Sequence, residues 1–515
     1  MLRWVAAISI ILAFCISIYS WLRFRDRHPG YEVAIEAEVK SGAFEIGFAS
    51  EPINPEIIDK WVDVNQDARF RPEDGDSFTD INQNGRFDAI WIAGFHNQRA
   101  AMGIHDTLWA RTLIVQRGDC KIALCVIDAI GFGSDDIIEI RKRIEKQIEI
   151  DYVTVSSTHS HQTPDLLGMW GDGDFDRGVN DDYLQLVKER CVKSVLAANA
   201  NLRPAKLRYA EDLSVAEHLV EDSRKPIVLD PGLRILHFTD ARSDQTLGTL
   251  IGWANHPETV WSKNMLLSSD FPHYLREAVE RGIYQGDSLW IPGLGGTSIF
   301  INGAIGGLMT ASPRFGIMSL MGDTTFIKPS FDKAKAQGET LAFLALQLLA
   351  DTSWGVKSEA GLKLMARSVE LPMKNHLFKL ANWLGVLDRG MTGWFKIRSE
   401  ICYWSLGNVG FLHVPGEIYP EIVNGGIESP PGQDYPINPV EIPPLRHLLP
   451  ATHNFVVGLS NDMIGYIIPK SEWDEEKPYL YHDHDSPYGE VNSLGPETAP
   501  ILHNAIVKIL EDWEE

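Results

Sequence analysis

The stretch "KIALCVIDAIGFGSDDIIEIRKRIEKQIEIDYVTVSSTHSH", residues 121–161, decides the fold. Its first part, "KIALCVID" (121–128), predicts a buried strand because it is almost wholly apolar. "SDDIIEIRKRIEKQIEI" (134–150) predicts a helix with Ser134 as N-cap and one apolar stripe (Ile137, Ile140, Ile144 and Ile148). "YVTVSST" (152–158) predicts a second strand. Strand, helix and strand in this order form a β-α-β unit, for which we expect parallel pairing.

Strand-like runs recur along the chain, and each leads to a polar residue. They are "TLGTLIGWAN" before His256, "NVGFLHVPG" before Glu417, and "NFVVGLS" before the turn that precedes Tyr466. Helical patterns at 181–199 and 333–350 would cover the strands. We therefore expect an α/β architecture, a mixed sheet with covering helices.

The composition indicates a globular protein that does not bind nucleic acid. The 515 residues are 44% hydrophobic, enough for one large core or two ordinary ones, and carry a formal net charge of -23. This charge argues against binding nucleic acid or anionic lipid through bulk electrostatics. No low-complexity linker or repeat divides the chain after the N-terminal region. One catalytic domain over residues 30–515 is the simplest organisation.

The N-terminus holds an uncharged segment from Trp4 to Leu22 with arginines on both sides. Its length is close to the roughly 20 residues that a bilayer-spanning helix needs. No small-x-small cleavage site follows, so residues 1–29 are interpreted as an uncleaved signal-anchor. A signal peptide that is cut at an unusual site is the alternative. Together with the calcium loops at 63–88, which suit the high calcium outside the cytosol, the segment predicts that the domain lies outside the cytoplasm, in the periplasm or at the cell surface.

An acidic segment at about 61–90 has the pattern of calcium loops. In "DINQNGRFD" (80–88) oxygen ligands stand at alternate positions, and Gly85 permits a sharp turn. "DVNQDARF" (63–70) repeats the spacing, and Glu73, Asp74 or Asp76 can close a second site. The candidate side-chain ligands are Asp63, Asn65, Asp67, Asp80, Asn82, Asn84 and Asp88. A solvated acidic turn is the alternative to these structural Ca²⁺ sites.

Two histidines, His159 and His161, follow the strand at 152–158. Residues two apart in an extended segment face the same side, so both imidazoles can point into one cavity. Ligands of open α/β sheets bind beyond the carboxyl ends of strands, where Asp128 also falls. A metal site, an acid–base pair and a simple polar turn all remain open at this point. Zinc needs about three protein ligands and an open position, and His256, Glu417 and Tyr466 also follow strands.

The chain resembles a known family, the neutral, non-lysosomal ceramidases, which are zinc-dependent amidases of N-acylsphingosine. Six motifs carry the resemblance in the family's order, from about residue 45 to 505. They are "GIHDTLWARTLIV" (103–115), "VTVSSTHSHQTPD" (153–165), "WANHPETV" (253–260), "LSSDFPHYLREAVE" (267–280), "HVPGEIYPEI" (413–422) and "GLSNDMIGYIIPKSEW" (458–473).

The resemblance implies a zinc site at the strand ends. It makes His159, His256 and Glu417 zinc ligands, Tyr466 an unusual phenolic fourth ligand, and His161 the neighbouring catalytic histidine. Two neutral imidazoles and one carboxylate leave zinc enough positive charge to activate a bound water near neutral pH. Tyr466 would also donate a hydrogen bond to the oxyanion. Asp270, like Asp128, would support catalysis by orienting imidazole protons.

The chain also departs from the family pattern. In "NGAIGGLMTASP" (302–313), Gly307 and Met309 stand where the family has an aspartate and a substrate-contacting serine. Tyr479 or Tyr481 would replace one of the family's later tyrosines. Only 49 residues follow Tyr466 in the 515-residue sequence, so we expect the family's C-terminal immunoglobulin-like domain to be missing.

These observations predict a membrane-anchored zinc amidohydrolase that cleaves a lipid-like N-acyl amide. Two alternatives remain. One is a non-catalytic, calcium-stabilised surface-binding protein on the same scaffold. The other is a zinc hydrolase of an ester or of another amide.

Overall fold

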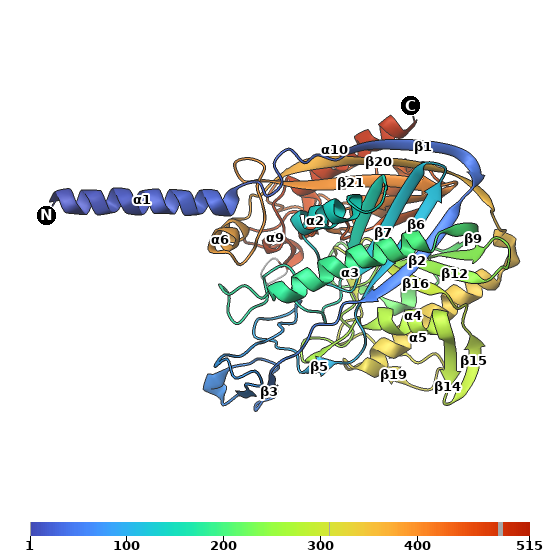
Figure 1. Ribbon diagram of the computed structural model, residues 1–515, viewed down its shortest axis with the longest axis horizontal. Helices are drawn as coiled ribbons and strands as arrows, with labels where there is room; N and C mark the ends of the chain where they lie inside the picture. Colours follow the sequence, from blue (N-terminus) through green and yellow to red (C-terminus); the bar gives the residue numbers. More distant parts are fainter. Residues whose placement is uncertain (1, 308, 483–487, 515) are drawn as a thin grey trace.

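The computed structural model describes residues 2–307, 309–482 and 488–514. Two β-sheets pack face to face at its centre (Figure 1). The larger sheet has eight strands in the order β16-β12-β11-β9-β2-β6-β7-β8. Their bounds are β2 (Glu45–Pro52), β6 (Trp109–Arg117), β7 (Cys120–Ile127), β8 (Tyr152–Ser157), β9 (Arg203–Asp212), β11 (Leu233–Asp240), β12 (Thr246–Trp253) and β16 (Thr297–Asn302).

The smaller sheet has five strands in the order β1-β20-β21-β22-β24. Their bounds are β1 (Ala34–Ala43), β20 (Glu359–Pro372), β21 (Lys396–Leu406), β22 (Val409–His413) and β24 (His453–Val457). Three pairs are parallel, namely β7 with β8, β12 with β16, and β22 with β24. The other pairs within the two sheets are antiparallel, so both sheets are mixed.

Apolar residues on both faces of a strand explain the layering. On β7, Leu124 and Val126 face the smaller sheet, whereas Ala123 and Ile127 face the covering helices. Because successive side chains of a strand point to opposite faces, an unbroken apolar run is buried on both. Outer helices are therefore needed to keep the second face of the larger sheet from water.

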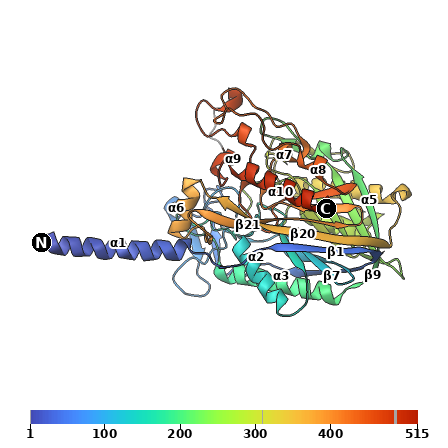
Figure 2. The same cartoon turned by 90° about the horizontal axis from the view of Figure 1, so that it is seen from above.

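Helices cover the outer faces of both sheets (Figure 2). The larger sheet is covered by α2 (Ser134–Glu145), α3 (Asp181–Ala200), α4 (Phe271–Arg281) and α5 (Phe331–Ala350). The smaller sheet is covered by α10 (Thr498–Glu514), which packs on β20 and β21. The layers therefore follow the order helices, eight strands, five strands, helix.

The predicted mixed sheet with covering helices is confirmed, and β7, α2 and β8 form the expected parallel unit. The expected N-cap is wrong, because the cap position is Gly133, which has no capping side chain. The backbone amide of Ser134 donates instead to Asp462 Oδ1 at 3.1 Å, so a distant segment caps the helix. A second sheet, which the sequence patterns do not separate from the first, is also present.

Shorter elements connect these layers. The strands are β3 (Lys60–Val62), β4 (Ser77–Thr79), β5 (Gly103–Ile104), β10 (Glu221–Asp222), β13 (Leu266–Leu267), β14 (Gly282–Gln285), β15 (Ser288–Pro292), β17 (Met309–Thr310), β18 (Ile317–Met318), β19 (Thr325–Phe326), β23 (Glu417–Ile418) and β25 (Tyr466–Ile467). The helices are α6 (His376–Leu384), α7 (Pro420–Asn424), α8 (Leu445–Leu448) and α9 (Tyr488–Val491).

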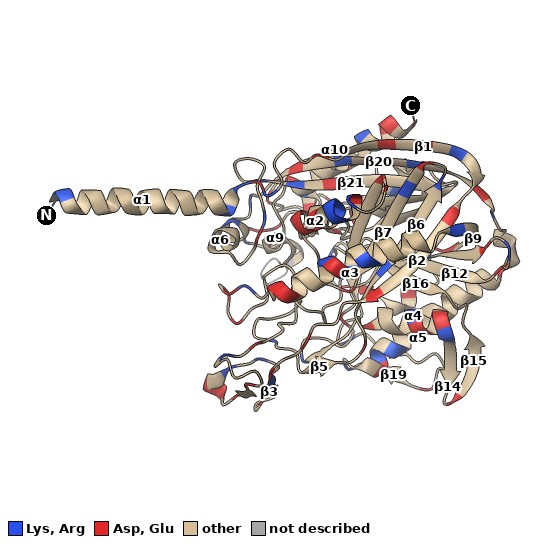
Figure 3. Cartoon of the chain, viewed as in Figure 1, with Lys and Arg blue, Asp and Glu red and all other residues tan. Residues whose placement is uncertain are grey.

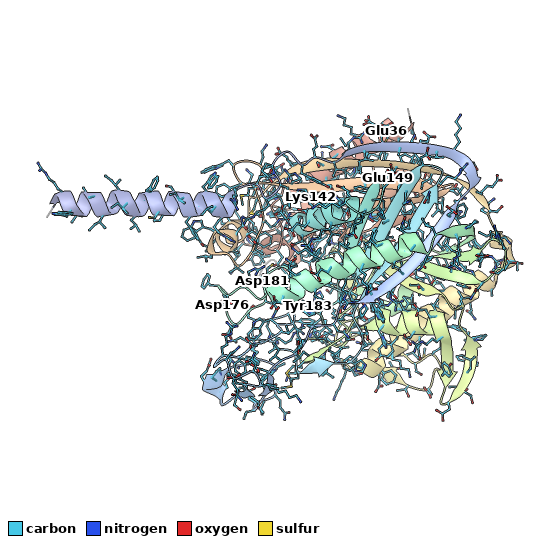
Figure 4. All side chains as sticks on the ribbon, viewed as in Figure 1. Glu36, Lys142, Glu149, Asp176, Asp181 and Tyr183 are labelled. Atoms are coloured by element: carbon cyan, nitrogen blue, oxygen red, sulfur yellow. The ribbon has the colours of Figure 1, made fainter. Side chains whose placement is uncertain are left out.

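The N-terminal helix α1 (Leu2–Phe24) projects away from the domain, and its side chains stand free along most of its length (Figure 4). It is uncharged between a basic residue near its start and another near its end (Figure 3). The segment Arg3–Phe24 is long and apolar enough to cross a membrane, a property that signal sequences share. The division into an anchor at 1–29 and a domain at 30–515 stays a prediction.

Candidate metal centre

Four side chains with metal-binding chemistry converge at the ends of strands. His159 lies two residues after β8, and His256 lies three residues after β12. Glu417 begins β23 and Tyr466 begins β25, and these two short strands pair in parallel with Glu417 opposite Tyr466. The structure thus brings together residues that are spread over more than 300 positions of the sequence, as their places after strands indicated.

The donor atoms of the three histidines His159, His161 and His256 and of Glu417 are close enough to share one ion. The nearest ring nitrogens of His159, His161 and His256 all lie within 4.8 Å of one another. Glu417 Oε2 lies 3.1 Å from His256 Nε2 and 3.4 Å from His159 Nε2. All four side chains are buried, so water does not compete freely for their donor atoms.

Backbone carbonyls orient two of the imidazoles. His159 Nδ1 lies 2.5 Å from the carbonyl oxygen of Ile130, and His256 Nδ1 lies 2.8 Å from that of Met309. Because a carbonyl can only accept, each Nδ1 carries a proton and donates it. Each Nε2 then faces Glu417 and the centre of the cluster, where it can share a proton with the carboxylate or, once that proton is displaced, offer its lone pair to a metal.

His161 is held differently. Neither of its ring nitrogens has a hydrogen-bond partner among the described residues, although the side chain is buried. Its Nδ1 approaches Glu258 Oε2 at 3.4 Å, and its ring packs edge-on against Phe95. Burial, reinforced by the neighbouring imidazoles, lowers the pKa of His161 well below its ordinary value and keeps the ring neutral. Buried polar atoms without partners are rare, and their presence here indicates a group kept for a ligand or a metal.

The local charges also suit a cation. Burial alone would raise the pKa of Glu417, but charge and hydrogen bonds from His159 and His256 outweigh it, and the net pKa lies well below the usual range. Burial raises the pKa of the Tyr466 phenol well above its ordinary value, and the negative charge of Glu417 adds to this effect. The donor set of imidazoles, one carboxylate and one phenol therefore fits a divalent transition metal.

The backbone at His159 is strained, as at many functional sites. His159 has φ 68°, in the left-handed region that side chains other than glycine seldom adopt. Its amide donates to the carbonyl of Ala129 at 2.9 Å, which fixes the turn after β8. Such strain, of order 1–3 kcal/mol, persists only where the surrounding structure imposes it.

Two residues beside the cluster were not predicted from the sequence. Glu258 is buried next to His161, and it accepts a hydrogen bond from Thr310 Oγ1 at 2.5 Å. Burial raises the pKa of Glu258 above its ordinary value. Arg99 is also buried and donates to the backbone carbonyls of Ala93 and His161. The position of Glu258 only two residues after His256, in "NHPE", was the available signal.

The role expected for Asp270 is not the one that the structure gives it. Asp270 is the N-cap of α4, and its carboxylate accepts from the amides of Phe271 at 2.7 Å and Val260 at 3.0 Å. Asp128, also expected near an imidazole, pairs with Arg276 at 2.9 Å. The two carbonyls described above orient the imidazoles of His159 and His256 instead.

Position 309 also differs from the expectation. The Met309 side chain is fully buried in the core that lies under α4 and α5, and it does not line the cavity described below. The tyrosines that pack on Tyr466 are Tyr488 and Tyr419, with ring centroids 5.9 and 6.1 Å from its own, rather than Tyr479 or Tyr481. The Tyr481 hydroxyl bonds Glu428 at 2.6 Å, away from the cluster.

A cavity of about 310 Å³ reaches the cluster. Its walls include His159, His161, Glu417 and Tyr466, and much of the remainder is apolar (Leu166, Leu167, Met169, Met373, Phe378 and Leu387). The volume falls within the range of small-molecule sites in proteins. Charged residues of the wall are paired, as Arg27 with Asp388 at 2.6 Å and Arg389 with Asp462 at 2.7 Å. The cavity therefore suits an uncharged, largely apolar ligand.

The acidic loops lie apart from this cluster, around the β3–β4 hairpin. Asp80 accepts from the backbone amides of Asn84 at 3.1 Å and Gly85 at 2.7 Å, which closes the second loop. Asp88 Oδ2 lies 2.7 Å from the Asn82 side-chain nitrogen. In the first loop Arg71 pairs with Asp67 and, at 2.7 Å, with Asp74. The Ca²⁺ ligands proposed from the sequence stay predictions.

Comparison with known proteins finds a shared fold at low sequence identity. The crystal structure of neutral ceramidase from Pseudomonas aeruginosa aligns at 15% identity and a TM-score of 0.61, over 91% of this chain and 74% of that chain. A structure described as ceramidase complexed with C2 aligns at 14% identity and a TM-score of 0.63, over 92% of this chain and 75% of that chain. No family model and no curated protein matches the chain. The fold is therefore that of the neutral ceramidase structures.

Proposed function

We propose that this chain is a zinc-dependent hydrolase of the neutral ceramidase type, which cleaves the amide bond of an N-acyl sphingoid lipid or a related N-acyl amide. The observation that carries the proposal is the buried group of three imidazoles and one carboxylate at the end of an apolar cavity. The shared fold supports the proposal because it aligns over most of the chain.

His159, His256, Glu417 and Tyr466 would hold the zinc ion. Bound zinc supplies a Lewis acid that polarises the scissile carbonyl and acidifies water. His161, neutral and without a partner, would accept a proton from the attacking water and pass it to the leaving amine. The Tyr466 phenol, whose pKa is raised, would remain a hydrogen-bond donor to the oxyanion.

Glu258 would position His161 in this reaction. Its carboxyl group approaches His161 Nδ1 at 3.4 Å, and its other oxygen is held by Thr310. The contact is too long and poorly directed for a full hydrogen bond, so the effect of Glu258 on the ring would be electrostatic. His161 Nε2 is then left for the substrate side of the cavity, which His161 itself lines.

The cavity supports a lipid amide over a charged substrate. Apolar side chains can take an acyl chain, and the paired wall charges offer no free cation to a phosphate. An ester or a different amide would fit the same cavity. A non-catalytic binding protein does not explain why carbonyls hold two buried histidines with both Nε2 atoms turned towards one carboxylate.

Metal analysis and turnover test the proposal together. The purified full chain is expected to contain one zinc ion and to release fatty acid from short N-acyl sphingoid analogues. His256→Ala should lose both the metal and the activity. His503→Ala is the matched control, because His503 is a buried histidine far from the cluster that contacts the Pro443 carbonyl. Zinc-loaded protein that ignores N-acyl amides but cleaves esters would replace the amidase by an esterase, and a metal-free wild type would overturn the proposal.

A second variant decides between two ligand sets. His161→Ala should keep its zinc if His159, His256, Glu417 and Tyr466 are the ligands, and should lose activity only. If His161 is itself the third histidine ligand, as its distance from the other two allows, the same variant loses its zinc.

We also propose that residues 1–29 anchor the protein in a membrane, with the domain outside the cytoplasm. The apolar, exposed helix α1 supports the anchor. Protease added to intact cells or spheroplasts should then digest the domain, whereas protection of the domain until lysis would place it inside the cytoplasm.

Ca²⁺ in the loops at 63–88 would stabilise the domain without taking part in the reaction, since these loops lie apart from the histidine cluster.

A further inference from the structure

An apolar surface distinct from the cavity lies beside the C-terminal end of α1. The short helix α6 packs beside the last turns of α1 in both views (Figure 1; Figure 2). The Trp383 ring meets the Tyr19 ring edge-on at 5.5 Å, and Trp383 Nε1 donates to Ser20 Oγ at 2.9 Å. Arg23 Nη2 donates to the carbonyl of Leu387, just after α6, at 2.9 Å. These contacts fix the position of α6 relative to α1.

The helix α6 turns apolar side chains outward. Leu377, Leu380 and Leu384 are 62%, 43% and 38% exposed, at the i, i+3 and i+7 spacing of one helix face. The nearby Trp394 is 89% exposed. We call these four residues the α6 patch. A surface helix of a water-soluble domain normally turns such a stripe inward, so this patch needs a partner.

The contacts with α1 set the depth of α6. Ser20 lies four residues before Phe24, the last residue of α1, which corresponds to roughly 6 Å along a helix. A helix at the membrane interface inserts its apolar face roughly 5–10 Å into the boundary between headgroups and acyl chains. If α1 spans the bilayer, Trp383 therefore lies within the interfacial layer, and the α6 patch lies beside it.

We infer that the α6 patch binds the surface of the same bilayer that holds α1. Leucines and tryptophan are the residues that interfacial helices place in this layer. The α6 patch also adjoins the apolar segment of α1, so the two would meet the bilayer as one continuous apolar surface. Lys379, on the same helix, lies over the Phe395 ring at 4.8 Å and can reach lipid phosphates beside the patch.

Docking of the α6 patch would also determine how substrate enters the cavity, and this extension rests on the proposed function. Phe378 of α6, Leu387 and Arg27 all line the cavity that leads to the histidine cluster. With the α6 patch in the interface, this end of the cavity faces lipid. A substrate that resides in the bilayer would then enter along α6 without crossing water.

Nitroxide labels on the full chain test the docking directly, without any assay of activity. In a Cys15→Ser background, Leu380→Cys and Trp394→Cys are labelled, and the protein is placed in phosphatidylcholine nanodiscs. Leu289→Cys is the matched control, because Leu289 is a 51% exposed leucine on β15, far from α1 (Figure 1). Labels at 380 and 394 should be relaxed more by oxygen than by a water-soluble nickel complex, and the label at 289 should show the reverse.

Two outcomes would overturn the inference. Equal nickel accessibility at positions 380 and 289 would mean that the patch lies in water. Spin–spin broadening at position 380 that disappears on dilution with unlabelled protein would mean that a second copy covers the patch.

An activity experiment separates the docking inference from the hydrolase proposal. Leu380→Asp should slow cleavage of substrate embedded in vesicles several-fold, leave cleavage of a dispersed short-chain substrate unchanged, and differ in this from Leu289→Asp.

Discussion

Replacing His161 by leucine should stabilise the metal-stripped protein and abolish its turnover. The His161 ring is 6% exposed, and neither nitrogen has a hydrogen-bond partner among the described residues. A buried polar group without a partner costs about 1–3 kcal/mol. Leucine has nearly the same volume and no polar atom, so it removes this cost without opening a large cavity.

The net gain follows from what the substitution also removes. The edge-on contact with Phe95, at a centroid distance of 5.2 Å, contributes about 0.5–1.5 kcal/mol. The approach to Glu258 at 3.4 Å is too long and poorly directed to add much. We therefore expect His161→Leu to raise the free energy of unfolding by about 1 kcal/mol.

His256→Leu is the contrasting variant. It removes the hydrogen bond to the Met309 carbonyl and the 3.1 Å contact with Glu417. Of its two imidazole partners Glu417 then keeps only His159, at 3.4 Å, and a buried charge that loses a partner costs about 3–5 kcal/mol. Urea unfolding in a metal chelator measures both variants. A His161→Leu protein that is less stable than wild type by 1 kcal/mol or more, or that keeps its turnover with zinc, would refute the reasoning.

Two further predictions concern stability. Calcium should raise the melting temperature of the wild type more than that of Asp88→Asn, whose melting curve in chelator should match that of the wild type; an equal calcium shift in the two proteins would exclude the second loop. Acid should destabilise the fold through His413, because burial lowers its pKa to about 3 and its Nε2 accepts from Trp404 Nε1 at 2.8 Å. The unfolded histidine binds a proton near pH 6.5 and the folded one does not, so stability is full above that pH and falls as pH drops towards 3. The loss should reach about 3 kcal/mol by pH 4, and urea unfolding of His413→Gln should show a correspondingly flatter pH dependence.

The elements that carry the site could be predicted because their signals are local. The apolar run of β7, the isoleucine stripe of α2 and the strand before His159 each reveal themselves within about ten residues. The rule that ligands bind at strand ends then gathers His256, Glu417 and Tyr466 with His159 without any knowledge of pairing.

The rest depends on contacts between distant segments. The sequence around a carboxylate that follows a strand does not distinguish one that orients an imidazole from one that caps a helix. Asp270 is of the second kind and caps α4, at φ 62°. The cap of α2 comes from Asp462, over 300 residues away. The strand β1 pairs with β20 across a similar separation, which is why two sheets could not be told from one.

One residue shows how the two sheets are joined at the site. The Asn461 amide donates to the Val155 carbonyl at 2.7 Å, and Asn461 Oδ1 accepts from the Val155 amide at 3.0 Å. Asn461 therefore occupies both backbone groups of Val155 as a neighbouring strand would, at φ 64°, a conformation that asparagine tolerates better than most residues. Val155 lies four residues before His159, and Asn461 lies five before Tyr466. The backbone thus fixes the positions of His159 and Tyr466 relative to each other. Little binding free energy is therefore lost in ordering these two side chains when an ion binds.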